Sequence, residues 1–413
     1  MSRFLFVVPP LTGHTNPTIG VGQELQVRGH NVAWTGYPKL LRPLLPPGAQ
    51  LLAVGDDPAD DDQAMAEATK RSQGLRGAEA LLFLWEQFLL PLGTAMVPGV
   101  EAAVERFQPD VLVVDQQAIA GALVAQRRGL PWATSATTSA ELVDPFALLP
   151  KVGEWVKAAL VGFQTQFGVP AVRGDLRFSE KLVLAFSTPA LAGPGSFFPS
   201  HYRFVGPSLG ARPASADFPW GWLDPTRRLV LVSLGTVTAE AGRRFLGEAI
   251  TALRSLAGRV QAVVVGPADL ASALGAADRD VLVRPYVPQL ELLARVSAVV
   301  THGGHNTVCE TLAHGVPLVV APIRDDQPIV AQQVTDAGAG VRLKFGRAKT
   351  NDIRAAVSAV LDNPAYRKAA QRLQASFEAA GGAAAAADAL EHLVPGAVVP
   401  GSAAVVPGSA AVA

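Results

Sequence analysis

Residues 286–327 read YVPQLELLARVSAVVTHGGHNTVCETLAHGVPLVVAPIRDDQ. Within this stretch an apolar run, Ala298 to Thr301, leads directly into His302, Gly303 and Gly304, and a segment of helical pattern follows. Glycines between a strand and a helix leave room for a ligand beside the free backbone amides of the helix N-terminus. The stretch therefore predicts an anion-binding turn within an α/β fold.

Polar side chains in and after this turn extend the predicted site. His302 can offer a positive charge or a hydrogen bond beside a diphosphate, while Asn306 and Thr307 can donate to phosphate oxygens from the first helical turn. Glu310 lies further along the same helix, where a carboxylate could accept two ribose hydroxyls. Each residue alone would also suit a helix cap or a surface contact. Together and in this order, they indicate a nucleotide site.

The rest of the chain repeats the alternation of short apolar runs with longer segments of helical period. Continuous apolar strands separated by helices are typical of a parallel sheet that is covered on both faces. The chain is therefore predicted to be an α/β protein. The expected strands are Phe4 to Val8, Val32 to Thr35, Val111 to Val114, Leu229 to Ser233, Ala262 to Val265, Val281 to Val283, Ala298 to Thr301 and Leu318 to Ala321.

The length of 413 residues indicates two domains, because it exceeds what one ordinary hydrophobic core holds. Residues 207–222 resemble a linker in composition, and they divide the chain into domains at 1–206 and 223–394. Residues 395–413 carry the heptapeptide AVVPGSA twice, and two short copies cannot bury a core, so we expect a disordered or loosely packed tail. The last ordered helix is expected just before it, within residues 379–393.

Composition narrows the class of partner. Lys plus Arg equals Asp plus Glu at 35 each, so no charge excess favours nucleic acid or an anionic membrane surface. The apolar runs Phe4 to Val8 and Leu81 to Leu92 are too short for a signal peptide and a membrane span, respectively. The single cysteine, Cys309, excludes intramolecular disulfides and suits a reducing compartment. We expect a soluble cytoplasmic protein with a small-molecule partner.

Two further turns carry candidate chemistry. His14 follows the first expected strand, at the carboxyl edge of the sheet, where an imidazole can accept a proton near neutral pH or be an ordinary loop histidine. Asp115 ends the strand at Val111 to Val114 and could fix the tautomer of such a histidine or cap the next helix. Ser233, Gly235 and Thr236 follow the strand that opens the second domain and suit either a phosphate-binding turn or a strand-to-helix cap.

An acidic triplet at Asp60, Asp61 and Asp62 formally contains a DxD pattern, which can hold a divalent ion. No apolar strand immediately precedes it, and the neighbouring residues are mostly glycine, proline, aspartate and alanine. A solvated loop is the better interpretation, so no metal site and no bound cofactor are expected.

These motifs resemble the donor-binding signature of the UDP-glycosyltransferase superfamily, glycosyltransferase family 1, in its bacterial natural-product and macrolide type. The family's signature begins with Trp-x-Pro-Gln, continues through His-x-Gly-x-Asn-Ser/Thr with a later Glu, and ends in Asp-Gln after Gly-Val-Pro and a further proline. The resemblance extends to the N-terminus, where Gly13, His14 and Pro17 match the family's Gly-His-x-x-Pro turn. The residues matching the signature are Tyr286, Pro288, Gln289, His302, Gly304, Asn306, Thr307, Glu310, Gly315, Val316, Pro317, Pro322, Asp326 and Gln327.

The resemblance implies the GT-B fold, in which two Rossmann-like domains face each other across a cleft and the C-terminal helix packs back on the N-terminal domain. It implies an acceptor in the N-terminal domain and a nucleotide sugar in the C-terminal domain. It also implies that His14 is the catalytic base and that Asp115 is its partner. The residues expected to bind the donor are Gly13, Ser233, Gly235, Thr236, Tyr286, Val287, Gln289, His302, Gly303, Gly304, Asn306, Thr307, Glu310, Asp326 and Gln327.

Within that set, the resemblance gives each group a part of the donor. The base would stack on Tyr286 and pair with the backbone of Val287, and the ribose would be held by Gln289 and Glu310. The diphosphate would lie at the turn that begins with His302, and the sugar hydroxyls would bind Asp326 and Gln327.

Two departures from the family pattern limit what can be transferred. Tyr286 replaces the usual tryptophan, which keeps a stacking face but leaves the nucleotide open between UDP, which we favour, and TDP. His305 occupies a position where plant members carry tryptophan, so sugar contacts of the plant enzymes do not transfer to it.

The sequence thus predicts an inverting, metal-independent hexosyltransferase acting on a small lipophilic acceptor such as a polyketide, macrolide, terpenoid or flavonoid. The alternatives are a sugar-nucleotide epimerase, a lipid-linked sugar transferase and a non-catalytic helper protein that binds nucleotide sugars. A helper would be expected to lack His14 or Asp115, and the chain has both.

Overall fold

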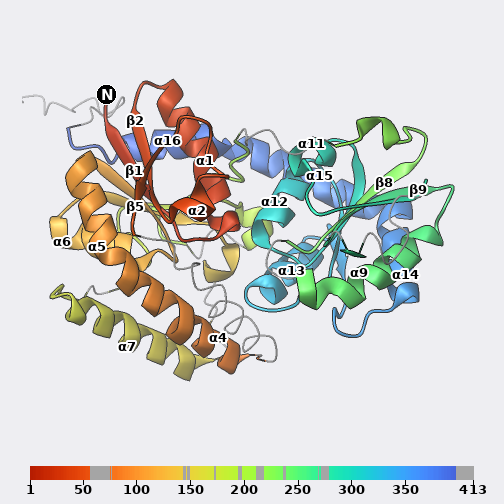
Figure 1. The fold of residues 1–413 in the computed structure, drawn as a ribbon, viewed down its shortest axis with the longest axis horizontal. Helices are drawn as coiled ribbons and strands as arrows, with labels where there is room; N and C mark the ends of the chain where they lie inside the picture. Colours follow the sequence, from red (N-terminus) through yellow and green to blue (C-terminus); the bar gives the residue numbers. More distant parts are fainter. Residues whose placement is uncertain are drawn as a thin grey trace, which may run out of the picture.

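The computed structural model describes residues 1–55, 75, 77–142, 146, 149–171, 174–193, 198–210, 218–235, 239–267, 269–270 and 279–396. Two parallel β-sheets, each flanked by helices, form two lobes (Figure 1), which confirms the predicted pair of Rossmann-like α/β halves. The acidic triplet at Asp60 to Asp62, Thr236, residues 211–217 of the expected linker and residues 397–413 of the expected tail lie outside the described residues.

The first sheet has the strand order β3-β2-β1-β4-β5-β6-β7, and all of its neighbouring strands pair in parallel. Its strands are β1 (Arg3–Val7), β2 (Asn31–Gly36), β3 (Gln50–Ala53), β4 (Val111–Asp115), β5 (Trp132–Ala136), β6 (Val183–Ala185) and β7 (Tyr202–Phe204). The strand order reverses between β1 and β4. In open parallel sheets, ligands bind at the carboxyl ends of the strands at such a reversal.

The helical segments of this lobe connect and cover these strands. They are α1 (Thr12–Val27), α2 (Pro38–Leu41), α4 (Ala78–Leu84), the π-helix η2 (Trp85–Leu89), α5 (Leu90–Phe107), α6 (Ile119–Arg128), the 3-10 helix η3 (Ser139–Glu141), α7 (Pro150–Gln166) and α8 (Pro189–Ala192).

The second sheet has the order β10-β9-β8-β11-β12-β13, again parallel throughout, with the reversal between β8 and β11. Its strands are β8 (Arg228–Ser233), β9 (Val260–Val265), β10 (Val281–Arg284), β11 (Val296–Thr301), β12 (Leu318–Val320) and β13 (Gly340–Arg342). The helical segments that precede and follow these strands are η5 (Trp220–Trp222), α9 (Ala239–Arg254), α11 (Gln289–Leu293), α12 (His305–Ala313), α13 (Gln327–Asp336), α14 (Thr350–Asp362), α15 (Pro364–Ala380) and α16 (Gly382–Glu391).

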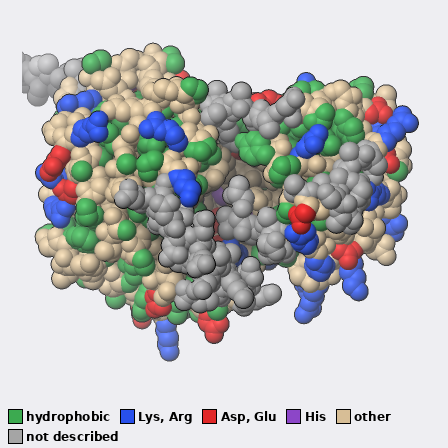
Figure 2. All heavy atoms as spheres, in the orientation of Figure 1, with side chains coloured by type: hydrophobic (Ala, Val, Ile, Leu, Met, Phe, Trp, Pro, Cys, Tyr) green, Lys and Arg blue, Asp and Glu red, His purple; other side chains and the backbone are tan. Residues whose placement is uncertain are grey.

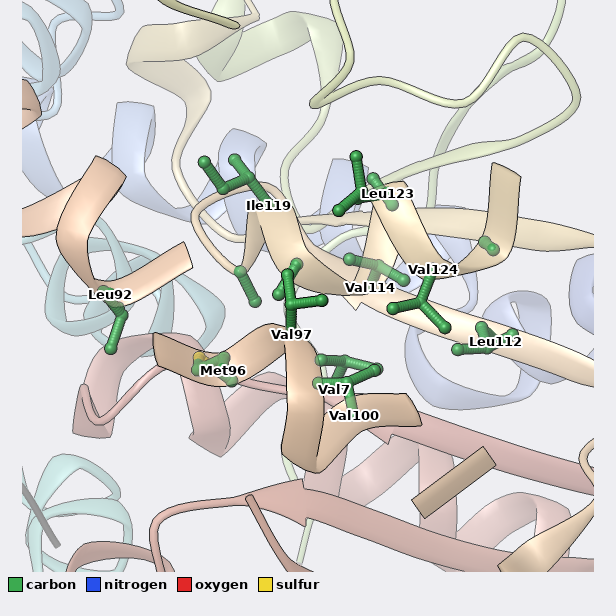
Figure 3. Close-up of a cluster of buried hydrophobic side chains, with 14 of the residues drawn as sticks. Val7, Leu92, Met96, Val97, Val100, Leu112, Val114, Ile119, Leu123 and Val124 are labelled. Atoms are coloured by element: carbon green, nitrogen blue, oxygen red, sulfur yellow. The ribbon is translucent and has the colours of Figure 1, made fainter. Parts of the chain in front are cut away.

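The central strands are buried on both faces, which explains why they are continuous apolar runs in the sequence. Leu5 and Val7 of β1 belong to a core with α5 and α6, part of which is drawn in Figure 3, whereas Phe4 and Phe6 belong to a core on the opposite face. Each such fully buried side chain stabilises the fold by about 1.5–3 kcal/mol relative to an exposed one.

The C-terminal helix α16 packs on the N-terminal lobe, as the sequence predicted. Its residues Ala386, Ala387 and Leu390 are fully buried in the core that contains β1 and α1. The backbone N–H of Gly382 donates to the carbonyl of Val205 at 2.7 Å, which fixes the start of the helix. Figure 1 shows this blue segment beside the red α1, far from the second sheet that precedes it in sequence.

The helical run Ala78–Phe107 is longer than the apolar stretch expected at Leu81 to Leu92. Among the described residues it is the one helix long and apolar enough to cross a membrane by length and composition, a test that the core helix of a globular protein also passes, and 33% of its most apolar window is buried. In the fold, Met96, Val97 and Val100 of this run are almost fully buried against the first sheet (Figure 3), as in the core helix of a globular lobe.

Candidate active site

His14 and Asp115 meet at the strand reversal of the first sheet. His14 lies in the first turn of α1, just after β1, and Asp115 is the last residue of the neighbouring strand β4. Nδ1 of His14 lies 2.9 Å from Oδ1 and 3.0 Å from Oδ2 of Asp115, whose side chain is buried. A buried carboxylate beside Nδ1 keeps the proton on that nitrogen, so Nε2 is the ring nitrogen that can act as a base.

The alternative role of Asp115 as a helix cap is not realised. The N-cap of α6 is Ala118, and Asp115 instead accepts a hydrogen bond from the backbone N–H of Gln117 at 2.8 Å. That bond holds the carboxylate in place for His14.

Thr137 contacts both members of this pair, and it was not among the predicted site residues. Its Oγ1 lies 2.7 Å from Nδ1 of His14 and donates to Oδ2 of Asp115 at 2.9 Å. Thr137 follows β5, the strand that pairs with β4. The available signal was a run of three hydroxyl residues, Thr137, Thr138 and Ser139, but the strand before it was not expected.

The next two residues connect this group to the second lobe. Thr138 donates from Oγ1 to Oδ2 of Asp326 at 2.7 Å. Ser139 lies 3.1 Å from Nδ1 of His305 and donates to Oε1 of Gln333 at 2.6 Å. The expected base and an expected sugar-binding residue are thus linked through two consecutive residues, Thr137 and Thr138. Figure 2 shows the two lobes side by side in a space-filling view.

The two turns of the second lobe that were predicted to bind an anion lie at the carboxyl ends of its neighbouring strands β8 and β11. Gly235 and Gly303 have φ angles of +73° and +91°, a region that favours glycine. A Cβ at Gly235 or Gly304 would come within 2.8 or 2.7 Å of the ring of His302. The backbone and the packing of His302 therefore require these glycines, in addition to the room for a ligand predicted at Gly303 and Gly304.

His302 is mostly buried between these turns. Burial lowers its pKa to about 4, and a hydrogen bond to the backbone of Ser233 opposes this shift only in part. At neutral pH its ring is therefore neutral. Of the two roles that the sequence left open, the lowered pKa favours hydrogen bonding over positive charge.

Glu310 is held by two side-chain amides. Nε2 of Gln289 donates to its Oε2 at 2.6 Å, and Nδ2 of Asn306 donates to its Oε1 at 2.8 Å. The carboxylate is 1% exposed. The structure thus brings together the two residues expected at the ribose, but it joins Asn306 to them rather than to the phosphate turn.

The structure also describes four further residues that were expected to bind the donor. Tyr286 is 57% exposed, so its ring is accessible for stacking, whereas the side chain of the adjacent Val287 is buried in the core. Thr307 lies in the first turn of α12. A Cβ at Gly13 would contact nothing within 4 Å, so the structure gives no steric reason for glycine there.

Gln327 is committed to the protein on one side of its amide. Its Oε1 accepts from the backbone N–H groups of Ile323 at 2.9 Å and Arg324 at 3.1 Å, and the residue is buried. The side-chain carbonyl of Gln327 holds the loop before α13. The side-chain NH₂ group is therefore the part of this amide that could bind a ligand.

His305 connects the lobes. It is 5% exposed, and its ring contacts Ser139 of the first lobe and, at 3.3 Å from Nε2, the backbone carbonyl of Phe186. Burial, reinforced by the nearby His14, lowers its pKa to about 4. His305 is therefore a neutral, buried residue at the contact between the two lobes.

Among the described residues, no group of three or more histidine, cysteine, aspartate or glutamate side chains is arranged to hold a metal ion.

Known proteins share this architecture and sequence. The family model of the UDP-glucoronosyl and UDP-glucosyl transferases matches residues 209–378. The 4'-demethylrebeccamycin synthase of Lentzea aerocolonigenes is 32% identical over 426 residues, which cover 95% of this chain and 100% of that protein. The demethyllactenocin mycarosyltransferase of Streptomyces fradiae is 29% identical over 95% of this chain and 87% of that protein. The crystal structure of the kitacinnamycin glycotransferase superposes with a TM-score of 0.74 at 25% identity, covering 95% of this chain and 99% of that one.

The two-lobed fold and its relatives define a glycosyltransferase. More particularly, the chain belongs to the family of UDP-glucuronosyl and UDP-glucosyl transferases.

Proposed function

We propose that this enzyme is an inverting, metal-independent glycosyltransferase that moves a sugar from a nucleoside diphosphate sugar to a hydroxyl of a small lipophilic natural product. One observation carries the proposal. The pair of His14 and Asp115 is bonded to Thr137, and the next residue, Thr138, is bonded to Asp326 across the lobes. A base in one lobe therefore lies near a group suited to sugar hydroxyls in the other.

The donor half of the proposal is supported by the second lobe. The exposed ring of Tyr286 suits stacking on a base. The carboxylate of Glu310, which Gln289 and Asn306 hold in place, has lone pairs that could accept ribose hydroxyls. We favour UDP as the nucleotide. TDP is the alternative, because a tyrosine ring stacks on either base. The sugar is expected beside Asp326 and the NH₂ group of Gln327.

Transfer would proceed in one displacement. Nε2 of His14 takes the proton of the acceptor hydroxyl as its oxygen attacks the anomeric carbon, and the bond from that carbon to the diphosphate oxygen breaks. The configuration at the anomeric carbon therefore inverts. The diphosphate leaves toward His302 and the N-terminal amides of α12, which stabilise negative charge without a divalent ion.

A lipophilic acceptor is supported by the first lobe and by the relatives. Partly buried apolar side chains of α4 and its surroundings, among them Leu81, Leu82, Phe88 and Phe146, border the core of that lobe. The names of the relatives given above refer to 4'-demethylrebeccamycin, demethyllactenocin and kitacinnamycin. We expect a hydroxylated aglycone of this kind, in a cytoplasmic enzyme.

The test combines a variant, a chelator and product analysis. His14→Ala is expected to lower the transfer rate by about 100- to 10,000-fold, as loss of a general base does. His392→Ala is the matched control, because this exposed histidine contacts the carbonyl of Asp388 in its own helix end. Wild-type activity should survive EDTA, and NMR of the product should show inversion. Near-full activity of His14→Ala, loss of activity in EDTA or retention of configuration would contradict the proposal.

Incubation with a nucleotide sugar and no acceptor separates this function from the alternatives. We expect no epimerised donor and only slow hydrolysis of the nucleotide sugar, since the displacement needs the acceptor. An epimerised nucleotide sugar would instead identify an epimerase, and binding without transfer to any member of an aglycone panel would identify a helper protein.

A further inference from the structure

Both residues expected to bind the sugar already have protein partners. Oδ2 of Asp326 accepts a hydrogen bond from the hydroxyl of Thr138 at 2.7 Å. The side-chain carbonyl of Gln327 accepts hydrogen bonds from two backbone N–H groups. A sugar that reached this position would therefore find fewer open acceptors than the sequence motif implies.

The Thr138 hydroxyl is oriented toward Asp326. Its Oγ1 accepts a hydrogen bond from the backbone N–H of Ala140 at 3.4 Å as the N-cap of η3, so the hydroxyl proton is directed at the carboxylate. Thr138 is 4% exposed. Thr138 is thus a buried, oriented donor that occupies one oxygen of Asp326 in the way a sugar hydroxyl would.

This bond changes how the site should discriminate between sugars. A site whose carboxylate is paired only by a substrate hydroxyl rejects the analogue lacking that hydroxyl, because the carboxylate is left unpaired in a dry site. Here Thr138 keeps one carboxylate oxygen paired whichever sugar is bound. The loss in kcat/KM for a donor that lacks this sugar hydroxyl should therefore be smaller.

We propose that Thr138 is a specificity-determining residue that adapts the donor site to deoxysugars, meaning nucleoside diphosphate sugars that lack a hydroxyl facing Asp326. The proposal rests on the proposed function, since it presumes that the sugar lies beside Asp326. It also gives a reason for a hydroxyl residue reaching across the lobes at this point.

The experiment compares donors on the full-length enzyme with one acceptor. UDP-glucose and its 3-deoxy, 4-deoxy and 6-deoxy analogues are assayed, and kcat/KM for each analogue is divided by that for glucose. Wild type should use at least one analogue within about 10-fold of glucose. Thr138→Val keeps the shape and removes the donor, so it should lower the ratio for that analogue by about 10- to 100-fold, the effect of losing a hydrogen bond to a charged group.

The ratio of kcat/KM values is the decisive readout. A loss of folding or of contact between the lobes lowers kcat/KM for every donor alike, so it cancels in the ratio. Thr138→Ser should restore the wild-type ratio. Ser139→Ala is the matched control, since Ser139 bridges to His305 and Gln333 but makes no bond to Asp326, and its ratio should equal that of wild type. A Thr138→Val ratio equal to wild type, or wild-type rejection of all three analogues by more than about 1,000-fold, overturns the inference.

Failure of the proposed function looks different in the same assay. If no nucleotide sugar supports transfer by wild type, glycosyl transfer from such donors is wrong. If glucose is transferred and the ratio does not respond to Thr138, only the deoxysugar inference is wrong.

Discussion

Nδ1 of His14 lies 2.9 Å from Oδ1 of Asp115, although 101 positions separate the two residues in the sequence. They meet because β1 and β4 are neighbours at the point where the strand order reverses, so the residues at their carboxyl ends face the same crevice. The sheet topology thereby assembles an imidazole and a buried carboxylate from two distant turns.

Asp115→Asn should lower kcat by about 100-fold or more with a small change in the KM for the donor, because the amide no longer fixes the imidazole for proton transfer. Steady-state kinetics with varied donor would measure both parameters. Asp110→Asn is the control just before the opposite end of the same strand, where the partly exposed carboxylate accepts from the backbone N–H of Arg3 and pairs with its guanidinium at 4.0 Å. Equal losses in the two variants would refute a specific role for Asp115.

Glu310→Gln should weaken nucleotide binding by about 10-fold, because a charged acceptor for ribose hydroxyls is lost. Isothermal titration with UDP and with 2'-deoxy-UDP would show the effect, and wild type should discriminate between them more strongly than the variant. Thermal unfolding should be recorded as well, since the new amide faces two other amides, Gln289 and Asn306. Glu291→Gln, on the exposed face of α11, should bind like wild type.

Acid should destabilise the fold through two buried histidines, His302 and His305. Burial lowers each pKa from 6.5 to about 4, so below pH 6.5 the unfolded chain binds protons that the folded chain does not. The free energy of unfolding should therefore fall by up to about 1.4 kcal/mol per pH unit per histidine as the pH drops from 6.5 toward 4.

Urea unfolding at several pH values would measure this slope. His305→Asn should make the slope shallower, because one of the two buried imidazoles is removed. A His305→Asn slope identical to wild type would show that His305 titrates normally in the folded protein.

Leu390→Ala should reduce the free energy of unfolding by about 2–5 kcal/mol, because Leu390 of α16 is fully buried against the first lobe. Arg28→Ala should cost less, about 1 kcal/mol, although Arg28 pairs with Asp388 and Glu391 of the same helix. Those ion pairs are partly exposed and screened by water. Chemical denaturation of the two variants side by side would test whether α16 is held by apolar burial, and a larger loss in Arg28→Ala would contradict it.

The sequence predicted the middle of each sheet better than its edges. Strands such as β1 and β11 are buried on both faces and therefore read as apolar runs. The short strands β7 and β13 have three residues each, too few for a pattern. The strand β5, WATSA, mixes small and polar residues because its end leads into the site, so its apolar signal is weak.

The same limit applies to the candidate site. His14, Asp115 and Glu310 could be found because each follows or lies near a recognisable turn or motif. Thr137 and Thr138 could not, since their contacts depend on β5 lying beside β4 and on the two lobes meeting, neither of which leaves a local pattern. The charge state of His302 likewise follows from packing between Gly235 and Gly304, which only the folded arrangement reveals.

The position of α16 also constrains how the enzyme is made and how it can be recombined. One face of the first sheet is completed by a helix that the ribosome adds only after the whole second sheet. This face of the first lobe therefore stays uncovered until α16 has been synthesised, after the second sheet. A chimera that exchanges second lobes between relatives should accordingly have two junctions, one before β8 and one at Gly381, so that α16 stays with the lobe it covers.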